Sequence, residues 1–386
     1  MLIAQGRLAA GALDGWVVVV TGAGGGIGFE AARSLLWLGA TVVIAEIDVA
    51  SGREAEARLA AEWTAPRVAF VPADVGDEAS VRHLVQTTVE RFGVIDAVVN
   101  NATYAPVGKP VAEIPISDWD RSYAVNLRGP AMLAAAVLPG MIARRRGVFA
   151  CVSSTGGPFL AAYESLKAAQ VALASSLDAE LDGTGVIAFT IGPGLVPTTT
   201  ASRAVELLAP KLGMSVDEFW KVNAGAVLPV EAAGAGFAAA VAMAERYGGQ
   251  EISSSQALID AGIDLDAKRP VASHADAGDS ARSRELARHV HDTLAEQAEG
   301  WKQRSFFERQ WMLRDFKQHV GVPVERCLEE LTAVDMPDRK LLMKLAGFYD
   351  HMSDLARGYV KDPVAREQQL QVVAGWKHEV EELDRR

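Results

Sequence analysis

The sequence predicts an α/β protein with a doubly wound parallel sheet, followed by an all-helical extension at the C-terminus. From about residue 13 to residue 263, short β-branched segments alternate with stretches whose apolar residues recur at helical spacing. A segment rich in Pro, Ser, Ala, Asp and Gly follows, and helical spacing then continues to the end. We therefore expect a sheet domain over 1–263, a linker over 264–283 and a helical extension over 284–386.

The strands expected for the sheet are short and almost entirely apolar, which is typical of parallel strands buried on both faces. They span 17–20, 41–45, 68–71, 97–100, 148–153, 186–191 and 258–260. In the extension we expect one long or broken helix over 284–318 and further helices over 325–331, 338–361 and 366–383. Pro337 and Pro363 lie near two of these helix starts, where proline is tolerated.

Composition excludes several classes of protein. The 386 residues carry a net charge of −11 without a basic block, which argues against nucleic-acid or anionic-membrane binding. The two cysteines provide no disulfide framework, and the N-terminus has no long apolar segment before the first strand. We expect a cytoplasmic protein without a signal peptide or a transmembrane helix.

The run from Thr21 to Gly28, TGAGGGIG, is the most informative feature of the sequence. It follows an expected strand and opens an expected helix, the arrangement in which a helix N-terminus receives a pyrophosphate. Gly22 permits the tight turn, Gly26 allows close approach of the ligand, and Gly28 allows helix and strand to pack closely. With Glu46 at the end of the next strand, the pattern predicts a Rossmann-type dinucleotide site.

Tyr163 and Lys167 form the second signal, because i,i+4 spacing places them on one face of a helix. An ammonium near a phenol favours the phenolate, so we expect Lys167 to lower the pKa of Tyr163. Tyrosine then serves as a general acid or base near neutral pH. Ser153 and Ser154 end the strand just upstream, where a hydroxyl would reach a substrate oxygen.

Over residues 13–263 the chain resembles the short-chain dehydrogenase/reductase family. Several motifs occur in the order found in that family: TGxxxGxG from Thr21 to Gly28, the acidic pair Asp74-Val75, Asn100-Asn101-Ala102 for NNAG, Asn126, Tyr163 and Lys167 for YxxxK, and Pro193-Gly194 followed by Thr198. The resemblance implies hydride transfer between a carbinol carbon and the nicotinamide of a bound cofactor.

The resemblance also assigns roles to individual residues. Tyr163 would exchange the hydroxyl proton, Ser154 would hold the substrate oxygen, and Lys167 would bind the nicotinamide ribose. Asn126 would order a water that links Lys167 to solvent. The cofactor would be held by Gly22, Gly24, Gly26, Ile27, Gly28, Glu46, Asp74, Val75, Asn101, Ala102, Tyr163, Lys167, Pro193, Gly194, Val196 and Thr198. No metal ion is expected.

Two departures from the family pattern concern the substrate pocket. Ser154 lies only nine residues before Tyr163, and the family usually has several more, so substrate specificity does not carry over. The short spacing also keeps Ser153 open as an alternative to Ser154. Thr103 replaces the glycine of NNAG and adds a side chain near the nicotinamide.

Glu46 favours NAD as the cofactor, because a carboxylate accepts hydrogen bonds from both ribose hydroxyls and repels a 2′-phosphate. An NADP site would want a nearby arginine or lysine, whereas Gly25 and Ile47 occupy the flanking positions. We expect an NAD-dependent oxidoreductase acting on a secondary alcohol or ketone. The alternatives are an NADP-dependent carbonyl reductase and a non-catalytic nucleotide sensor or scaffold.

Structural roles compete with these functional assignments at several positions. Asn126 alternatively satisfies a backbone kink, Asp74 caps the next helix in competition with Asp77, and Thr198 caps a helix. Asn100 and Asn101 alternatively serve as turn residues. The apolar residues between 195 and 228 predict either a flap over a partly hydrophobic substrate or ordinary packing.

The extension has no assigned role in the family. Subunit contacts in a dimer or tetramer, a cover over the active site and docking to another protein are the competing roles. We expect a homo-oligomer, as is common in the family. His289 and His291 are spaced i,i+2 and therefore point apart on a helix, which argues against a metal site.

Overall fold

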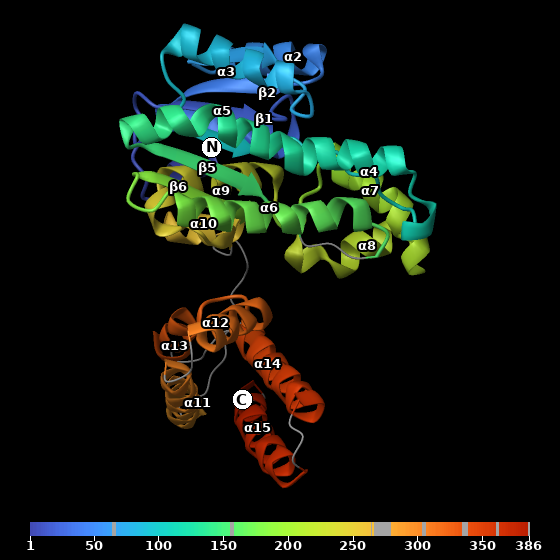
Figure 1. The fold of residues 1–386 in the computed structure, drawn as a ribbon, viewed down its shortest axis with the longest axis vertical. Helices are drawn as coiled ribbons and strands as arrows, with labels where there is room; N and C mark the ends of the chain where they lie inside the picture. Colours follow the sequence, from blue (N-terminus) through green and yellow to red (C-terminus); the bar gives the residue numbers. More distant parts are fainter. Residues whose placement is uncertain are drawn as a thin grey trace. The chain divides into compact units, whose positions relative to one another are not determined.

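The computed structural model describes residues 1–63, 67–154, 158–263, 265, 279–302, 306–333, 339–359 and 363–384. The chain divides into two compact units, Met1–Arg269 and Pro270–Arg386. The first unit contains a seven-stranded sheet in the order β3-β2-β1-β4-β5-β6-β7, and all neighbouring strands pair in parallel (Figure 1). This confirms the predicted fold class.

The strands are β1 (Val17–Thr21), β2 (Thr41–Glu46), β3 (Val68–Pro72), β4 (Ala97–Asn100), β5 (Gly147–Val152), β6 (Val186–Gly192) and β7 (Glu251–Ser253). The helices of the first unit are α1 (Gly26–Trp37), α2 (Val49–Ala61), α3 (Glu78–Phe92), α4 (Ile116–Tyr123), α5 (Gly129–Arg144), α6 (Ala161–Glu180), α7 (Thr199–Leu208), α8 (Val216–Val222), α9 (Val230–Ala242) and α10 (Ser254–Asp260).

Both faces of the sheet are covered because successive strand residues point to opposite sides. In β1, Val18 and Val20 pack into the core beneath α1, α2 and α9. Val17 and Val19 pack into the core beneath α3, α5 and α6. The carboxyl ends of β1, β2, β4 and β5 therefore meet at one edge, where ligands bind in this architecture.

The seventh strand was predicted wrongly. Residues 258–260 lie in α10, and β7 is the segment Glu251–Ser253. Ser253 ends the strand and caps α10 by accepting the N–H of Gln256 at 3.0 Å. Leu258 is fully buried on the helix face that packs on α9, so burial rather than strand structure explains its apolar neighbourhood.

One described stretch, Ile116–Arg144, is long and apolar enough to cross a membrane by length and composition. It comprises α4, a π-helical turn η3 (Ala124–Arg128) and α5. Its residues Leu133, Val137 and Met141 are buried in the core of the sheet. This packing accounts for the apolar composition of the stretch.

The second unit contains α11 (Asp279–Lys302), α12 (Phe306–Val320), α13 (Val324–Ala333), α14 (Arg339–Tyr359) and α15 (Pro363–Asp384). The long helix expected over 284–318 is thus the broken alternative. Residues 279–283, expected in the linker, belong to α11, whereas 264 and 266–278 lie outside the described residues. The bundle has its own core, in which Phe316 and Phe348 pack edge to face at 4.9 Å.

Candidate active site

The glycine turn between β1 and α1 is closely packed at Gly22, Gly24 and Gly28, where a side chain would clash. Gly22 and Gly26 have φ of +65° and +56°, a region that favours glycine. A Cβ on Gly22 would lie 2.8 Å from the Ala102 Cα, and a Cβ on Gly28 would lie 2.5 Å from the Gly22 carbonyl oxygen. Ile27 is partly buried in the first turn of α1. Backbone and helix N-terminus alone therefore form the cradle, which fits a pyrophosphate.

Glu46 closes one side of this cradle from the end of β2. Its Oε2 accepts the N–H of Gly24 at 3.1 Å, and its Oε1 accepts the N–H groups of Ile47 at 2.8 Å and Asp48 at 3.2 Å. A Cβ on Gly24 would lie 2.8 Å from the Glu46 Cγ, so the glycine lets the carboxylate approach the turn. The residues present therefore fit a dinucleotide cofactor.

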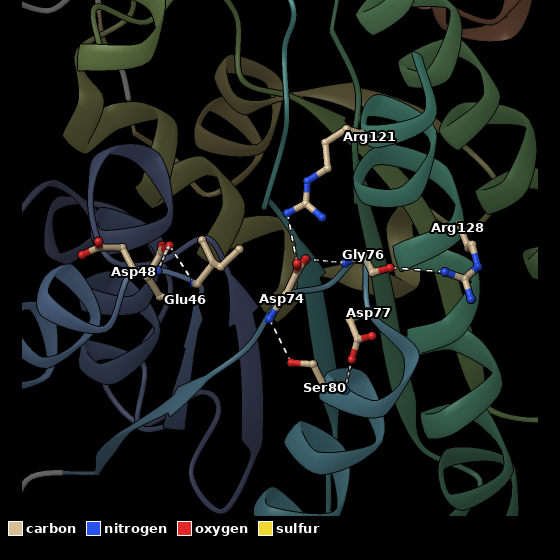
Figure 2. Close-up of polar contacts among 9 residues, drawn as sticks. Glu46, Asp48, Asp74, Gly76, Asp77, Ser80, Arg121 and Arg128 are labelled. Atoms are coloured by element: carbon tan, nitrogen blue, oxygen red, sulfur yellow. Dashed lines mark hydrogen bonds and ion pairs between the residues drawn. The ribbon is translucent and has the colours of Figure 1, made fainter. Parts of the chain in front are cut away.

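The carboxylate of Asp74, after β3, contacts Gly76 and Arg121, and the Asp74 N–H donates to the Ser80 hydroxyl at 2.9 Å (Figure 2). Its Oδ1 accepts the N–H of Gly76 at 2.9 Å, and its Oδ2 pairs with the Arg121 guanidinium of α4 at 3.0 Å. The N-cap of α3 is Asp77, which accepts the N–H of Ser80 at 2.8 Å. Asp74 therefore does not cap α3, and that alternative is wrong. The Asp74 carboxylate lies next to the buried Val75 at the edge of the sheet.

Asn101 ties the end of β4 to the glycine turn. Its Nδ2 donates to the carbonyl oxygens of Thr21 at 2.9 Å and Gly22 at 3.0 Å. The Ala102 N–H donates to the Thr21 hydroxyl at 2.9 Å. Thr103 comes next in the chain and hydrogen-bonds to the Tyr163 side chain. Three consecutive residues thus link the cradle to the phenol.

Tyr163 and Lys167 lie on one face of α6, and the Lys167 Nζ is 5.7 Å from the centroid of the Tyr163 ring. The fully buried Lys167 donates to the Val152 carbonyl at 2.7 Å. Burial lowers the pKa of Lys167 to about 8. Burial also raises the pKa of Tyr163 above its ordinary value, and the neighbouring Glu164 carboxylate adds to this.

This direction is opposite to the one predicted from the Tyr163–Lys167 spacing. Desolvation penalises the charged phenolate, and its effect on the Tyr163 pKa outweighs the opposing effect of the Ser154 and Thr103 hydroxyls. A cationic nicotinamide ring would favour the phenolate when bound.

Ser154 rather than Ser153 lies beside Tyr163. The Ser154 hydroxyl hydrogen-bonds to the Tyr163 side chain and to Glu164 Oε1, the latter at 2.8 Å. Ser153 is buried, and its Oγ would be 3.2 Å from a Cβ on Gly192. Ser153 therefore packs against β6, away from the phenol.

Asn126 occupies the π-helical turn between α4 and α5, and all four hydrogen bonds of its amide are made. Its Nδ2 donates to the Tyr104 carbonyl at 2.6 Å and the Ser122 hydroxyl at 3.0 Å. Its Oδ1 accepts from the Thr103 hydroxyl at 2.8 Å and the Tyr104 N–H at 3.3 Å. Asn126 thus fixes the backbone kink, as the structural alternative predicted, and it orients Thr103.

The segment after β6 borders the site. Thr198 caps α7 by accepting the N–H of Ala201 at 3.1 Å, as one alternative predicted. A Cβ on Gly26 would lie 3.4 Å from the Thr198 Cγ2, so the residue also adjoins the cradle. Pro193 and Gly194 are partly or fully exposed, and Val196 is buried.

Two side chains in the site were missed in the sequence. Glu164 contacts Ser154, and Gln170 donates from its Nε2 to the main-chain carbonyl of Asn126. Gln170 follows Tyr163 by seven residues and Lys167 by three, and this helical spacing is the signal that could have revealed it. No such signal exists for Glu164, because it directly follows Tyr163 and therefore does not share this helix face.

Comparisons with known proteins place the site in context. A family model described as short chain dehydrogenase matches residues 16–207. An uncharacterized oxidoreductase of Thermotoga maritima is 39% identical over 191 residues, which are 48% of this chain and 73% of the relative. A 1-deoxy-11-beta-hydroxypentalenate dehydrogenase of Streptomyces exfoliatus is 37% identical over 188 residues, which are 47% of this chain and 67% of the relative.

Among solved structures, an NAD+-bound xylitol dehydrogenase matches with a TM-score of 0.58 at 26% identity. The match covers 62% of this chain and 98% of that protein. The residues matched by the family model all lie in the first unit.

Proposed function

The chain belongs to the short-chain dehydrogenase family of oxidoreductases, and we propose that it transfers a hydride between a secondary alcohol or its ketone and NAD(H). One observation carries this proposal. The segment Asn101-Ala102-Thr103 contacts both the glycine turn and the Tyr163 side chain. A cofactor in the cradle and a substrate at the phenol would therefore lie next to each other, as hydride transfer requires.

Glu46 supports NAD over NADP. Its carboxylate is fixed by three backbone N–H groups and keeps lone pairs for ribose hydroxyls. A 2′-phosphate there would meet a like charge, and the neighbouring Ile47 offers no cation to offset it. When bound, the nicotinamide supplies the acceptor or donor of the hydride.

The acid/base work falls to the side chains on α6. Tyr163 would donate its proton to a ketone oxygen or take one from a carbinol, and Lys167 would hold the ribose from below the phenol ring. Ser154 would fix the substrate oxygen within reach of the same hydroxyl. Positioning and proton transfer together supply most of the barrier reduction.

A partly apolar substrate fits the borders of the site. A Cβ on Gly108 would lie 3.2 Å from the Leu207 Cβ of α7, and the Gly108 N–H donates to the Phe159 carbonyl at 3.0 Å. Lys211 lies over the Phe159 ring at 5.5 Å. These contacts bring α7 and its neighbours against the loops that flank Ser154 and Thr103, where they would form a flap over a bound substrate.

A spectrophotometric panel tests the proposal. Cyclohexanol, menthol and xylitol are each offered with NAD and with NADP, and formation of the reduced nicotinamide is followed. Turnover with NAD on an apolar alcohol is the expected result. Turnover with NADP alone would favour the carbonyl reductase, and tight NAD binding without turnover on any alcohol or ketone would favour the sensor.

A further inference from the structure

The main-chain carbonyl of Asn126 lies in a stretch of helix that cannot pair it in the ordinary way. The π-helical turn η3 spans Ala124–Arg128, and the N–H of Gly129 donates to the carbonyl of Ala124, five residues earlier. The α-helical donor to the Asn126 carbonyl would be the N–H of residue 130, which is proline and has none. Because Asn126 is fully buried, this carbonyl needs a donor from another element.

Gln170 of α6 supplies that donor. Its Nε2 donates to the main-chain oxygen of Asn126, and its side chain is fully buried. The Oε1 of the same amide has no hydrogen-bond partner among the residues that the structure describes. An unpartnered oxygen in the interior costs stability, and an apolar side chain of similar size would avoid that cost. The polar group of Gln170 is therefore accounted for by its one bond, to Asn126.

A second contact joins Asn126 to the start of α6, through the buried Ser122. The Ser122 hydroxyl donates to the Ala162 carbonyl at 2.6 Å and accepts from the Asn126 Nδ2 at 3.0 Å. The two points of contact on α6, at positions 162 and 170, flank the segment that carries Tyr163 and Lys167. Asn126 thus holds this segment of α6 from both ends.

The side-chain oxygen of Asn126 leads to the cofactor cradle. It accepts from the Thr103 hydroxyl at 2.8 Å. Two residues earlier in the chain, Asn101 donates to the carbonyl oxygens of Thr21 at 2.9 Å and Gly22 at 3.0 Å in the glycine turn. The hydrogen bonds of Asn126 therefore lie between α6 and the segment that reaches the cradle.

We propose that Gln170 is a positioning residue that sets where Tyr163 and Lys167 lie relative to the bound cofactor. The proposal rests on the proposed function. Gln170 acts through the Asn126 carbonyl, which fixes α6 against the π-helical turn. Loss of this bond would let α6 shift against the turn, and a displacement of about 1 Å is enough to slow an enzyme about a hundredfold.

Gln170→Met in the full chain removes the donor and keeps an unbranched side chain of similar length. With NAD and the best alcohol of the panel, kcat should fall about ten- to a hundredfold. KM and the Kd for NADH should stay within about twofold, because the positioning matters for the transition state and not for binding. A variant that keeps the wild-type kcat overturns the proposal.

Two further substitutions separate the hydrogen bond from side-chain volume. Gln170→Glu keeps the volume, but an ionised carboxylate only accepts hydrogen bonds, so it should lose at least as much kcat as Gln170→Met. Gln170→His keeps an N–H donor at a similar reach and should retain more kcat than either. Equal kcat in the three variants would assign the effect to volume and overturn the proposal.

Thr88→Val is the matched control for loss of a buried hydrogen bond. The fully buried Thr88 hydroxyl donates to the Leu84 carbonyl at 2.7 Å within α3. This variant should keep the wild-type kcat, whatever its thermal stability. A loss of kcat equal to that of Gln170→Met would show general loosening of the fold and overturn the proposal.

Amide hydrogen exchange without substrate separates this proposal from the proposed function. In Gln170→Met, peptides covering 101–104 and 122–130 should exchange faster than in the wild type or Thr88→Val, because the contacts of Asn126 with Thr103 and Tyr104 loosen. Unchanged exchange in both peptides overturns the positioning role, even if no alcohol is oxidised. Failure of the proposed function would instead appear as a wild-type chain that shows this difference in exchange but no turnover.

Discussion

The Oε2 of Glu46 accepts the N–H of Gly24 at 3.1 Å, so the end of β2 is joined directly to the glycine turn after β1. The contact is possible because Gly24 has no Cβ, which would lie 2.8 Å from the Glu46 Cγ. The Glu46 carboxylate and the backbone of the glycine turn are therefore positioned by each other.

Glu46→Arg should reverse the cofactor preference. Hydrogen bonds that the ribose hydroxyls donate to a carboxylate contribute about 1.5–3 kcal/mol, so the Kd for NAD should rise about tenfold or more. The Kd for NADP should fall, because the new cation pairs with its phosphate. Fluorescence titration of the reduced cofactors measures both.

Glu54→Arg is the matched control for that change, since Glu54 lies on α2 with 72% of its side chain exposed. It alters the net charge equally but should leave the preference unchanged. A Glu46→Arg variant that still prefers NAD would contradict the role given to Glu46.

Gly28→Ala should damage the cradle. Its Cβ would lie 2.5 Å from the Gly22 carbonyl oxygen, and relieving this contact requires backbone movement. Overpacking of this kind costs about 1–3 kcal/mol of stability, and the distorted turn should bind NADH more weakly. Gly25→Ala is the control, because nothing lies within 4 Å of a Cβ there. Thermal unfolding and NADH titration distinguish them, and equal behaviour of the two variants would argue against a close-packed turn.

Arg121→Met should weaken NADH binding about two- to fivefold. Arg121 holds the Asp74 carboxylate at 3.0 Å, but both side chains are partly exposed, so the ion pair contributes only about 0.2–1 kcal/mol. Arg82→Met breaks an exposed ion pair with Glu78 on α3 and serves as the control. Equal Kd values for the two variants would show that Arg121 does not position Asp74.

Ketone reduction should lose activity above about pH 8. Burial lowers the pKa of Lys167 to about 8, so the ammonium is present below that pH and is lost above it. Tyr163, whose pKa is raised by burial, stays protonated through this range and remains able to donate. The pH profile of kcat/KM should therefore be flat toward neutral pH and fall above about 8. Lys167→Arg should remove this fall, and a wild-type rate that climbs above pH 8 would contradict the assignment.

The fold was predictable from the sequence where the period of apolar residues is long enough to be seen. Strands β1, β2, β4, β5 and β6 each bury four or more residues. Strand β3 buries fewer, but it lies between two helices that the sequence shows clearly. Strand β7 has three residues, of which only Ile252 is buried, so no alternation marks it. A strand was predicted at 258–260 because this segment is more apolar than β7. Leu258 is buried there because α10 packs on α9.

Within the site, residues on one helix face were predictable and contacts between elements were not. Tyr163 and Lys167 are spaced one turn apart, which the sequence shows directly. The contact between Ser154 and Glu164 depends on how β5 and α6 are placed in space. The sign of the Tyr163 pKa shift depends on burial, which spacing alone does not reveal.

Comparison of Tyr163→Phe with the wild type, both loaded with NAD, tests the central claim most directly. The variant keeps the ring but removes the hydroxyl, so NADH affinity should be nearly unchanged. Oxidation of the best alcohol in the panel should fall about 10³-fold, within the range that general acid–base catalysis contributes. A variant that binds NADH normally and turns over at the wild-type rate would contradict the account.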